Sequence, residues 1–119
     1  MATSIEYLLK QNLHTVFGER NRDKRRATIA TIWKEDGVFI DPDGPHVGHK
    51  AIDEAVELLL HRFPNFVFSE VGAIDAFHGI GRLAWGFGPP GMPPKVTGLD
   101  VVVVTDGRLS ALYTFLDHK

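Results

Sequence analysis

The pattern of apolar residues changes near Phe66, and this change constrains the fold more than any other feature of the chain. Before it, apolar residues recur at spacings of three and four, which is typical of amphipathic helices. After it, runs rich in β-branched and aromatic residues alternate with short turn sequences, which is typical of antiparallel strands. Asp106-Gly107 separates two of these runs and is a strong hairpin signal. A helical first half and a β second half together predict an α+β fold.

Three helices are expected in the first half, at about residues 3–20, 21–34 and 49–62. Thr3 and Glu6 have the spacing of a capping box, which predicts the start of the first helix. The loop after the short strand at residues 37–41 is expected to lead directly into the third helix. Four strands are expected in the second half, at about residues 66–77, 79–87, 95–105 and 108–116.

The short strand carries the first candidate site residue. Its β-formers, Val38-Phe39-Ile40, run into the turn sequence Asp41-Pro42-Asp43-Gly44. Pro42 biases Asp41 toward an extended conformation, and strand alternation places Asp41 on the same face as Phe39. Two interpretations stay open: the carboxylate bonds to nearby backbone in an Asx turn, or it is an acid at the wall of a pocket.

The second candidate, Asp100, interrupts an otherwise apolar strand at residues 95–105, two residues after Gly98. Both faces of this strand are apolar, so the strand is expected to be buried on both sides. A carboxyl group in such a place needs a partner, or it is protonated with a raised pKa. A structural alternative is an ion pair with Arg82 or Arg108.

The quoted segments of the two candidate sites are part of a wider resemblance. Residues 38–44 and 48–52, with residues 98–104, 106–109 and 113–117, resemble the nuclear transport factor 2-like superfamily, in particular its SnoaL-like polyketide cyclase and ketosteroid isomerase branch. The resemblance covers nearly the whole chain. It implies one domain spanning all 119 residues, in the form of a cone-shaped α+β barrel. Three N-terminal helices would pack on a strongly curved, mostly antiparallel sheet.

The resemblance also implies site residues. Asp41 matches the general base of the isomerases and Asp100 matches their protonated oxyanion-hole aspartate. The tyrosine of the isomerases' first helix has no counterpart, since the only tyrosines are Tyr7 and Tyr113, and His14 is the nearest auxiliary donor. The residues expected to line the ligand pocket are Phe17, Trp33, Phe39, Phe63, Trp85, Phe87 and Val102.

Two functions follow as hypotheses. In the first, the chain is an enzyme without cofactor or metal, and Asp41, Asp100 and His14 perform acid/base chemistry of isomerase, cyclase or dehydratase type on a small apolar carbonyl compound. In the second, it is a non-catalytic ligand-binding or dimerisation module of the same fold. In both, the outer sheet face is expected to form a homodimer, because Leu99, Tyr113 and Phe115 would otherwise expose an apolar patch.

Composition limits the remaining possibilities. The chain has no cysteine, which excludes disulfides, thiolate zinc sites and cysteine nucleophiles. The formal net charge of −2 gives no reason to expect nucleic acid or a membrane surface as a partner. No apolar run has the length of a membrane span and no signal peptide is recognisable, so a cytoplasmic protein is expected. The charge run at residues 20–26 is expected to be a solvated loop and helix start.

Overall fold

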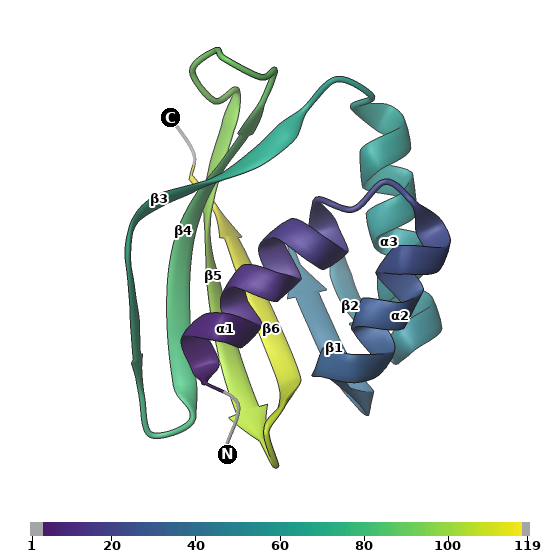
Figure 1. Cartoon of the computed structure of the whole chain (residues 1–119), viewed down its shortest axis with the longest axis vertical. Helices are drawn as coiled ribbons and strands as arrows, with labels where there is room; N and C mark the ends of the chain where they lie inside the picture. Colours follow the sequence, from purple (N-terminus) through teal and green to yellow (C-terminus); the bar gives the residue numbers. More distant parts are fainter. Residues whose placement is uncertain (1–3, 118–119) are drawn as a thin grey trace.

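The structure, a computed structural model, describes residues 4–117. Three helices lie across one face of a strongly curved six-stranded sheet (Figure 1). The helical elements are α1 (Ile5–Gln11), the π-helical segment η1 (Asn12–Phe17), α2 (Arg22–Ile32) and α3 (His49–Arg62). The strands are β1 (Trp33–Asp41), β2 (Gly44–Val47), β3 (Val67–Phe77), β4 (Ile80–Gly88), β5 (Val96–Thr105) and β6 (Arg108–Leu116).

The sheet has the strand order β2-β1-β6-β5-β4-β3. Its neighbours are antiparallel except for β1 and β6, which run parallel because the chain crosses from the first strand to the last. The strand β3 bends sharply across the sheet (Figure 1), and its pairing with β4 shifts register around Gly72, which has a φ of 73°. The expected α+β fold, with three helices on a curved and mostly antiparallel sheet, is confirmed.

The N-terminal helix differs from the prediction at both ends. Thr3 of the expected capping box lies outside the described residues, and the hydroxyl oxygen of Ser4 caps the helix by accepting the N–H of Tyr7 at 3.0 Å. From Asn12 the helix widens to π geometry, and it ends at Gly18, whose N–H bonds the carbonyl of Leu13. The helix therefore stops about two residues before the predicted end.

The boundary between α2 and β1 was also predicted wrongly. The backbone of Trp33 is already extended, so α2 ends at Ile32 and the following strand is longer than expected. The indole of Trp33 is fully buried and donates to Asn12 Oδ1 at 2.9 Å, while its backbone pairs with Leu109 of β6. Tertiary burial of this large side chain outweighs the weak helix preference of Trp33 itself.

Residues 44–47 form the edge strand β2 instead of the expected loop. This strand pairs with the end of β1, with Pro45 opposite Ile40 and His46 opposite Phe39. Proline is tolerated there because only one side of an edge strand needs its N–H groups for pairing. The strand matters for the site because it places a histidine beside the end of β1.

The hydrophobic core fills the space between the helices and the concave face of the sheet. Its most deeply buried members come from all three helices and from β1, β4, β5 and β6, and they include Leu8, Val16, Ile29, Trp33, Ile52, Leu83, Val102 and Leu112. Among the described residues, no helix is both long and apolar enough to cross a bilayer.

Candidate active site

The sheet register brings the two candidate aspartates into one row. Asp41 follows Ile40, whose partner on β6 is Tyr113, so Asp41 lies beside Thr114. Thr114 in turn pairs directly with Asp100 on β5. Paired residues on neighbouring strands point to the same face, and two strand spacings separate the two aspartates by about 10 Å. The row lies on the concave face that the helices cover.

Asp100 is buried and bonded to two neutral donors. Trp85 Nε1 and Thr114 Oγ1 each donate to Asp100 Oδ1 at 2.9 Å. Burial raises the pKa of Asp100 to about 6, and the two hydrogen bonds oppose that rise only in part. Neither Arg82 nor Arg108 forms an ion pair with Asp100 in the part of the chain that the structure describes. The ion-pair alternative considered from the sequence is therefore wrong.

Gly98 makes the bond from Trp85 to Asp100 possible. A Cβ atom at Gly98 would lie 2.4 Å from Trp85 Cζ2 and 2.6 Å from the carbonyl oxygen of Phe115. Without a side chain at this position, the indole lies against β5 and its N–H reaches the carboxyl two residues further along. The spacing of Gly98 and Asp100 was visible in the sequence, but the contact of both residues with Trp85 on β4 was not.

The sequence left two interpretations of Asp41 open, an Asx turn and an acid at a pocket wall, and the structure has features of both. Its Oδ1 accepts the N–H of Asp43 at 2.9 Å, which is an Asx turn. The same Oδ1 lies 3.4 Å from Nε2 of His46, whose ring stacks on Phe39 with centroids 5.1 Å apart. The position of His46 beside Asp41 was not predicted, because its strand was not predicted.

A hollow of about 370 Å³ lies where β1 ends beside β6. Asp41, Tyr113 and Thr114 are its polar lining residues, and Thr114 connects it to Asp100 through the hydrogen bond described above. The remaining lining residues are Ile40, Pro42, Phe115 and Leu116. An apolar hollow with two carboxyl groups near it has the chemical character needed to hold a small carbonyl compound.

His14, the third predicted catalytic residue, lies elsewhere. It is on η1, and its Nε2 pairs with Glu70 Oε2 of β3 at 2.7 Å. Its side chain is 43% exposed, and none of the hydrogen bonds among the described residues joins it to Asp41 or Asp100. The structure thus brings together two of the three predicted catalytic residues.

The predicted pocket-lining residues lie in the core or at its margin, where most of their aromatic rings contact other rings. All are buried except Phe63, which is half-buried. Phe17 meets Phe39 edge-on at 5.1 Å, and Phe63 meets Phe87 at 5.7 Å. Trp33 is at the opposite end of β1 from Asp41. The residues concerned are Phe17, Trp33, Phe39, Phe63, Trp85, Phe87 and Val102.

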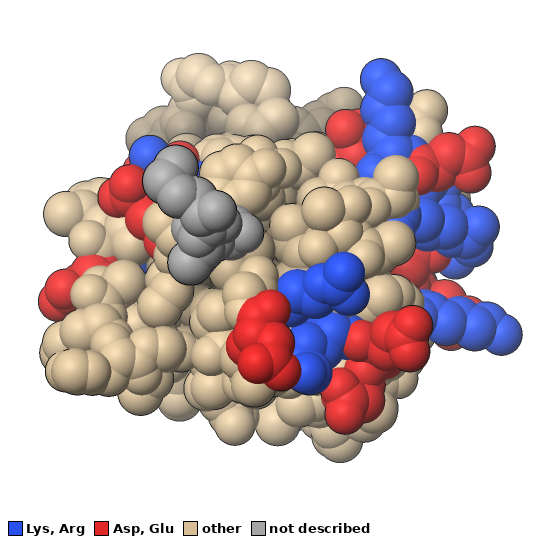
Figure 2. Space-filling model, turned by 60° about the horizontal axis from the view of Figure 1, so that its bottom comes forward, with Lys and Arg blue, Asp and Glu red and all other residues tan. Residues whose placement is uncertain are grey.

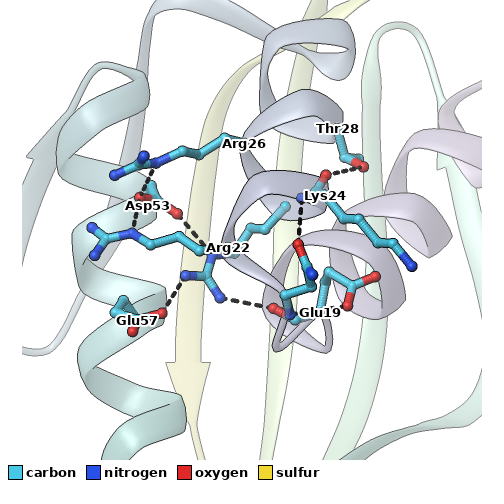
Figure 3. Close-up of polar contacts among 9 residues, drawn as sticks. Glu19, Arg22, Lys24, Arg26, Thr28, Asp53 and Glu57 are labelled. Carbon is cyan, nitrogen blue, oxygen red and sulfur yellow. Dashed lines mark hydrogen bonds and ion pairs between the residues drawn. The ribbon is translucent and has the colours of Figure 1, made fainter.

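The charge run at residues 20–26 is mostly an exposed loop and helix start, as predicted, with α2 beginning at Arg22, but Arg25 is an exception. Arg25 is fully buried and donates to Asp53 Oδ1 at 2.8 Å, to Glu57 Oε1 at 2.5 Å and to the carbonyl of Glu19 at 2.7 Å. Figure 3 shows these contacts joining α2 to α3. The face in Figure 2 carries interspersed positive and negative side chains between broad uncharged areas.

Asp53 is the centre of this ion cluster. It is 2% exposed and accepts hydrogen bonds from Arg22, Arg25 and Arg26 (Figure 3). Its burial disfavours the charge, but the three guanidinium hydrogen bonds outweigh burial and hold the pKa of Asp53 below its ordinary value. The cluster stabilises the packing of two helices. Among the described residues, no group of three or more His, Cys, Asp or Glu side chains could hold a metal ion.

Comparison with solved structures identifies the fold. A proposed isomerase of the SnoaL-like family from Agrobacterium tumefaciens strain C58 superposes with a TM-score of 0.88 and 24% identity, over 95% of this chain and 97% of that chain. The chain shares the fold of SnoaL-like and NTF2-like proteins. At this identity, the likeness concerns the fold alone.

Two further structures share the SnoaL-like fold. A proposed SnoaL-like polyketide cyclase from Jannaschia sp. CCS1 matches with a TM-score of 0.76 and 11% identity, over 94% of this chain and 84% of that chain. A proposed ketosteroid isomerase from Kribbella flavida DSM 17836 matches with a TM-score of 0.71 and 15% identity, over 95% of this chain and 77% of that chain. No protein-family model matches the chain. No curated protein matches its sequence.

Proposed function

We propose that the chain binds a small apolar carbonyl compound and performs cofactor-independent acid/base chemistry of the isomerase, cyclase or dehydratase type. One observation carries the proposal: Asp41 and Asp100 occupy one row of the concave sheet face beside the 370 Å³ hollow, and burial raises the pKa of Asp100 to about 6. Structural groups seldom combine an apolar hollow, two convergent acids and a perturbed pKa.

The two acids would have different roles. Asp41, as a carboxylate, would remove a proton from the carbon next to the carbonyl group. Asp100, in its protonated form, would donate a hydrogen bond to the oxygen on which negative charge develops. Because the carbonyl compound and its enol differ only in the position of a proton, this chemistry needs no redox partner. Protonation of Asp100 is lost as the pH rises through about 6, so the activity would fall over that range.

The structural neighbours support this proposal at the level of fold. Proteins with this architecture include a proposed isomerase and a proposed polyketide cyclase. The alternative, a non-catalytic module, is favoured by the Asx turn that engages Asp41 Oδ1 and by the aromatic side chains that fill the interior. Since both functions predict ligand binding, a measurement of proton transfer separates them.

The test is exchange of the enolisable hydrogens of cyclohex-2-enone for deuterium, followed by proton NMR in deuterated buffer near pH 6. Removal of a general base or acid is expected to slow the enzyme-dependent exchange at least about 100-fold, so Asp41→Asn and Asp100→Asn should each abolish it. Asp106→Asn is the matched control, because Asp106 lies in the β5–β6 turn and its side chain is 86% exposed. Exchange in the wild type at the rate of buffer alone would favour the non-catalytic module.

We further propose that the outer sheet face forms a homodimer. Tyr113 and Phe115 are 38% and 59% exposed there, and Phe77 at the end of β3 is 66% exposed. Burial of such rings in a symmetric interface is favourable. Sedimentation equilibrium at micromolar concentration is expected to give twice the chain mass, and Phe115→Lys is expected to give the monomer. A wild-type monomer would contradict this proposal.

A further inference from the structure

We propose that Thr114 is a positioning residue, which with Trp85 fixes Asp100 so that Oδ2 carries the proton offered to a ligand carbonyl oxygen. This inference rests on the proposed function and concerns the same site. It assigns a role to a residue that does not itself transfer a proton, and it specifies which atom of Asp100 meets the ligand.

The hydrogen bonds to Asp100 are all on one oxygen. Trp85 Nε1 and Thr114 Oγ1 both donate to Oδ1, each at 2.9 Å. A carboxyl oxygen has two lone pairs, so the two donors use both of those on Oδ1. When Asp100 is protonated, its proton therefore resides on Oδ2. None of the described residues donates to Oδ2, which leaves this O–H group available to a ligand.

Thr114 also lies at the point where the two acids meet. It pairs with Asp100 across β5 and β6, it lies beside Asp41 in the parallel register, and it lines the hollow. Its hydroxyl proton is committed to Asp100, so Thr114 offers the ligand only an acceptor oxygen. The O–H group that the contacts of Thr114 and Trp85 orient is thus the one on Oδ2 of Asp100.

The lining of the hollow indicates the charge of the ligand. The described residues that line it include one ionisable acid, Asp41, and no lysine or arginine. An anionic ligand such as a carboxylate or a phosphate would face a like charge with no compensating cation. A neutral carbonyl compound instead places its oxygen on the Asp100 proton and its carbon skeleton against an apolar side chain such as Leu116, which shares the sheet face of Thr114.

Carbon-13 NMR of the aspartate carboxyl groups tests the positioning role without any ligand or turnover. A hydrogen bond to a charged group is lost in Thr114→Val, so the titration midpoint of Asp100 is expected to rise by roughly one pH unit. Thr114→Ser keeps the hydroxyl and is expected to titrate like the wild type. Thr97→Val on the same strand as Asp100 is the matched control. An unchanged midpoint in Thr114→Val, or a serine variant that shifts as far as valine, would overturn the proposal.

Infrared spectroscopy of the protonated protein tests which oxygen carries the proton. With the proton on Oδ2, the C=O bond ends at Oδ1 and accepts two hydrogen bonds, which lowers its stretching frequency. Removal of one donor in Thr114→Val or Trp85→Phe is expected to raise that frequency, and a frequency unmoved in both variants would contradict the assignment. Because neither measurement uses a substrate, an inactive protein with these shifts would refute the proposed function alone.

Discussion

Asp53 and Asp100 are almost equally buried, at 2% and 5% exposure, yet their pKa values are shifted in opposite directions. Asp53 accepts hydrogen bonds from three arginines, and its pKa is lowered. Asp100 accepts hydrogen bonds from an indole and a hydroxyl group, and its pKa is raised to about 6. Burial disfavours the charged form of both acids, and the difference shows that the charge of the hydrogen-bond partners decides the direction of the net pKa shift.

The largest expected effect concerns Asp53 and its ion cluster. Arg25→Met leaves Asp53 and Glu57 without their buried cation, and it is expected to lower the free energy of unfolding by about 3–5 kcal/mol. Urea denaturation followed by circular dichroism measures this loss. Arg26→Met is the control, because Arg26 is 56% exposed and an exposed ion pair contributes about 1 kcal/mol or less. Equal losses in the two variants would show that burial of the cation does not matter.

The second prediction concerns the pH dependence of stability. Since the folded-state pKa of Asp100 exceeds its unfolded value, its contribution is complete below about pH 4 and is lost as the pH rises to about 6. The shift corresponds to about 3 kcal/mol by linkage, as an order of magnitude. The pH dependence of the Asp53 contribution has the opposite sign. Its stabilisation is present above the pKa of Asp53 in the unfolded state and is lost as the pH falls through the lower pKa of the folded state.

Thermal or urea unfolding of single variants between pH 4 and 7 measures these two contributions. Asp100→Asn is expected to remove the loss of stability between pH 4 and 6, and Asp53→Asn is expected to be most damaging near neutral pH. If Asp100→Asn has the same pH profile as the wild type, Asp100 is not the buried acid that the comparison requires.

The smallest expected effect is at Gly98, and it tests the hydrogen bond from Trp85 to Asp100. Gly98→Ala forces a methyl group against Trp85 and the backbone of Phe115, and overpacking of this kind costs about 1–3 kcal/mol. The displaced indole no longer donates to Asp100, so the pKa of Asp100 is expected to rise further, as measured by carboxyl NMR. Trp85→Phe removes the same donor without the clash and should give the same rise. An unchanged pKa in both variants would mean that the indole bond does not matter.

Regular periodicity explains what could be predicted from the sequence. The third helix was predicted at residues 49–62 and the last strand at residues 108–116, and both match α3 and β6. Alternation with a period of two also placed Asp41 and Asp100 on definite strand faces, and the register then brought them into one row. These features depend on neighbours along the chain, which the sequence shows directly.

Contacts between distant segments could not be predicted in the same way. No local pattern indicates that Arg25 is fully buried between two helices, because its burial depends on how α2 and α3 pack. The position of His46 beside Asp41 was missed because a short strand with a proline at a sheet edge has no strong local pattern. Thr114 was missed as well, because its role comes from a cross-strand contact with Asp100.

The sequence by itself determined the order and type of the elements, since local preference and the spacing of apolar residues act over a few positions. It also determined that Asp41 would end a short apolar strand and that Asp100 would interrupt a strand with apolar side chains on both faces. Only the tertiary structure decided the environment of each acid, because hydrogen-bond partners and desolvation come from residues far apart in the chain. Asp53 thereby became the centre of an ion cluster, while Asp100 received two neutral donors and kept a carboxyl group that titrates near pH 6.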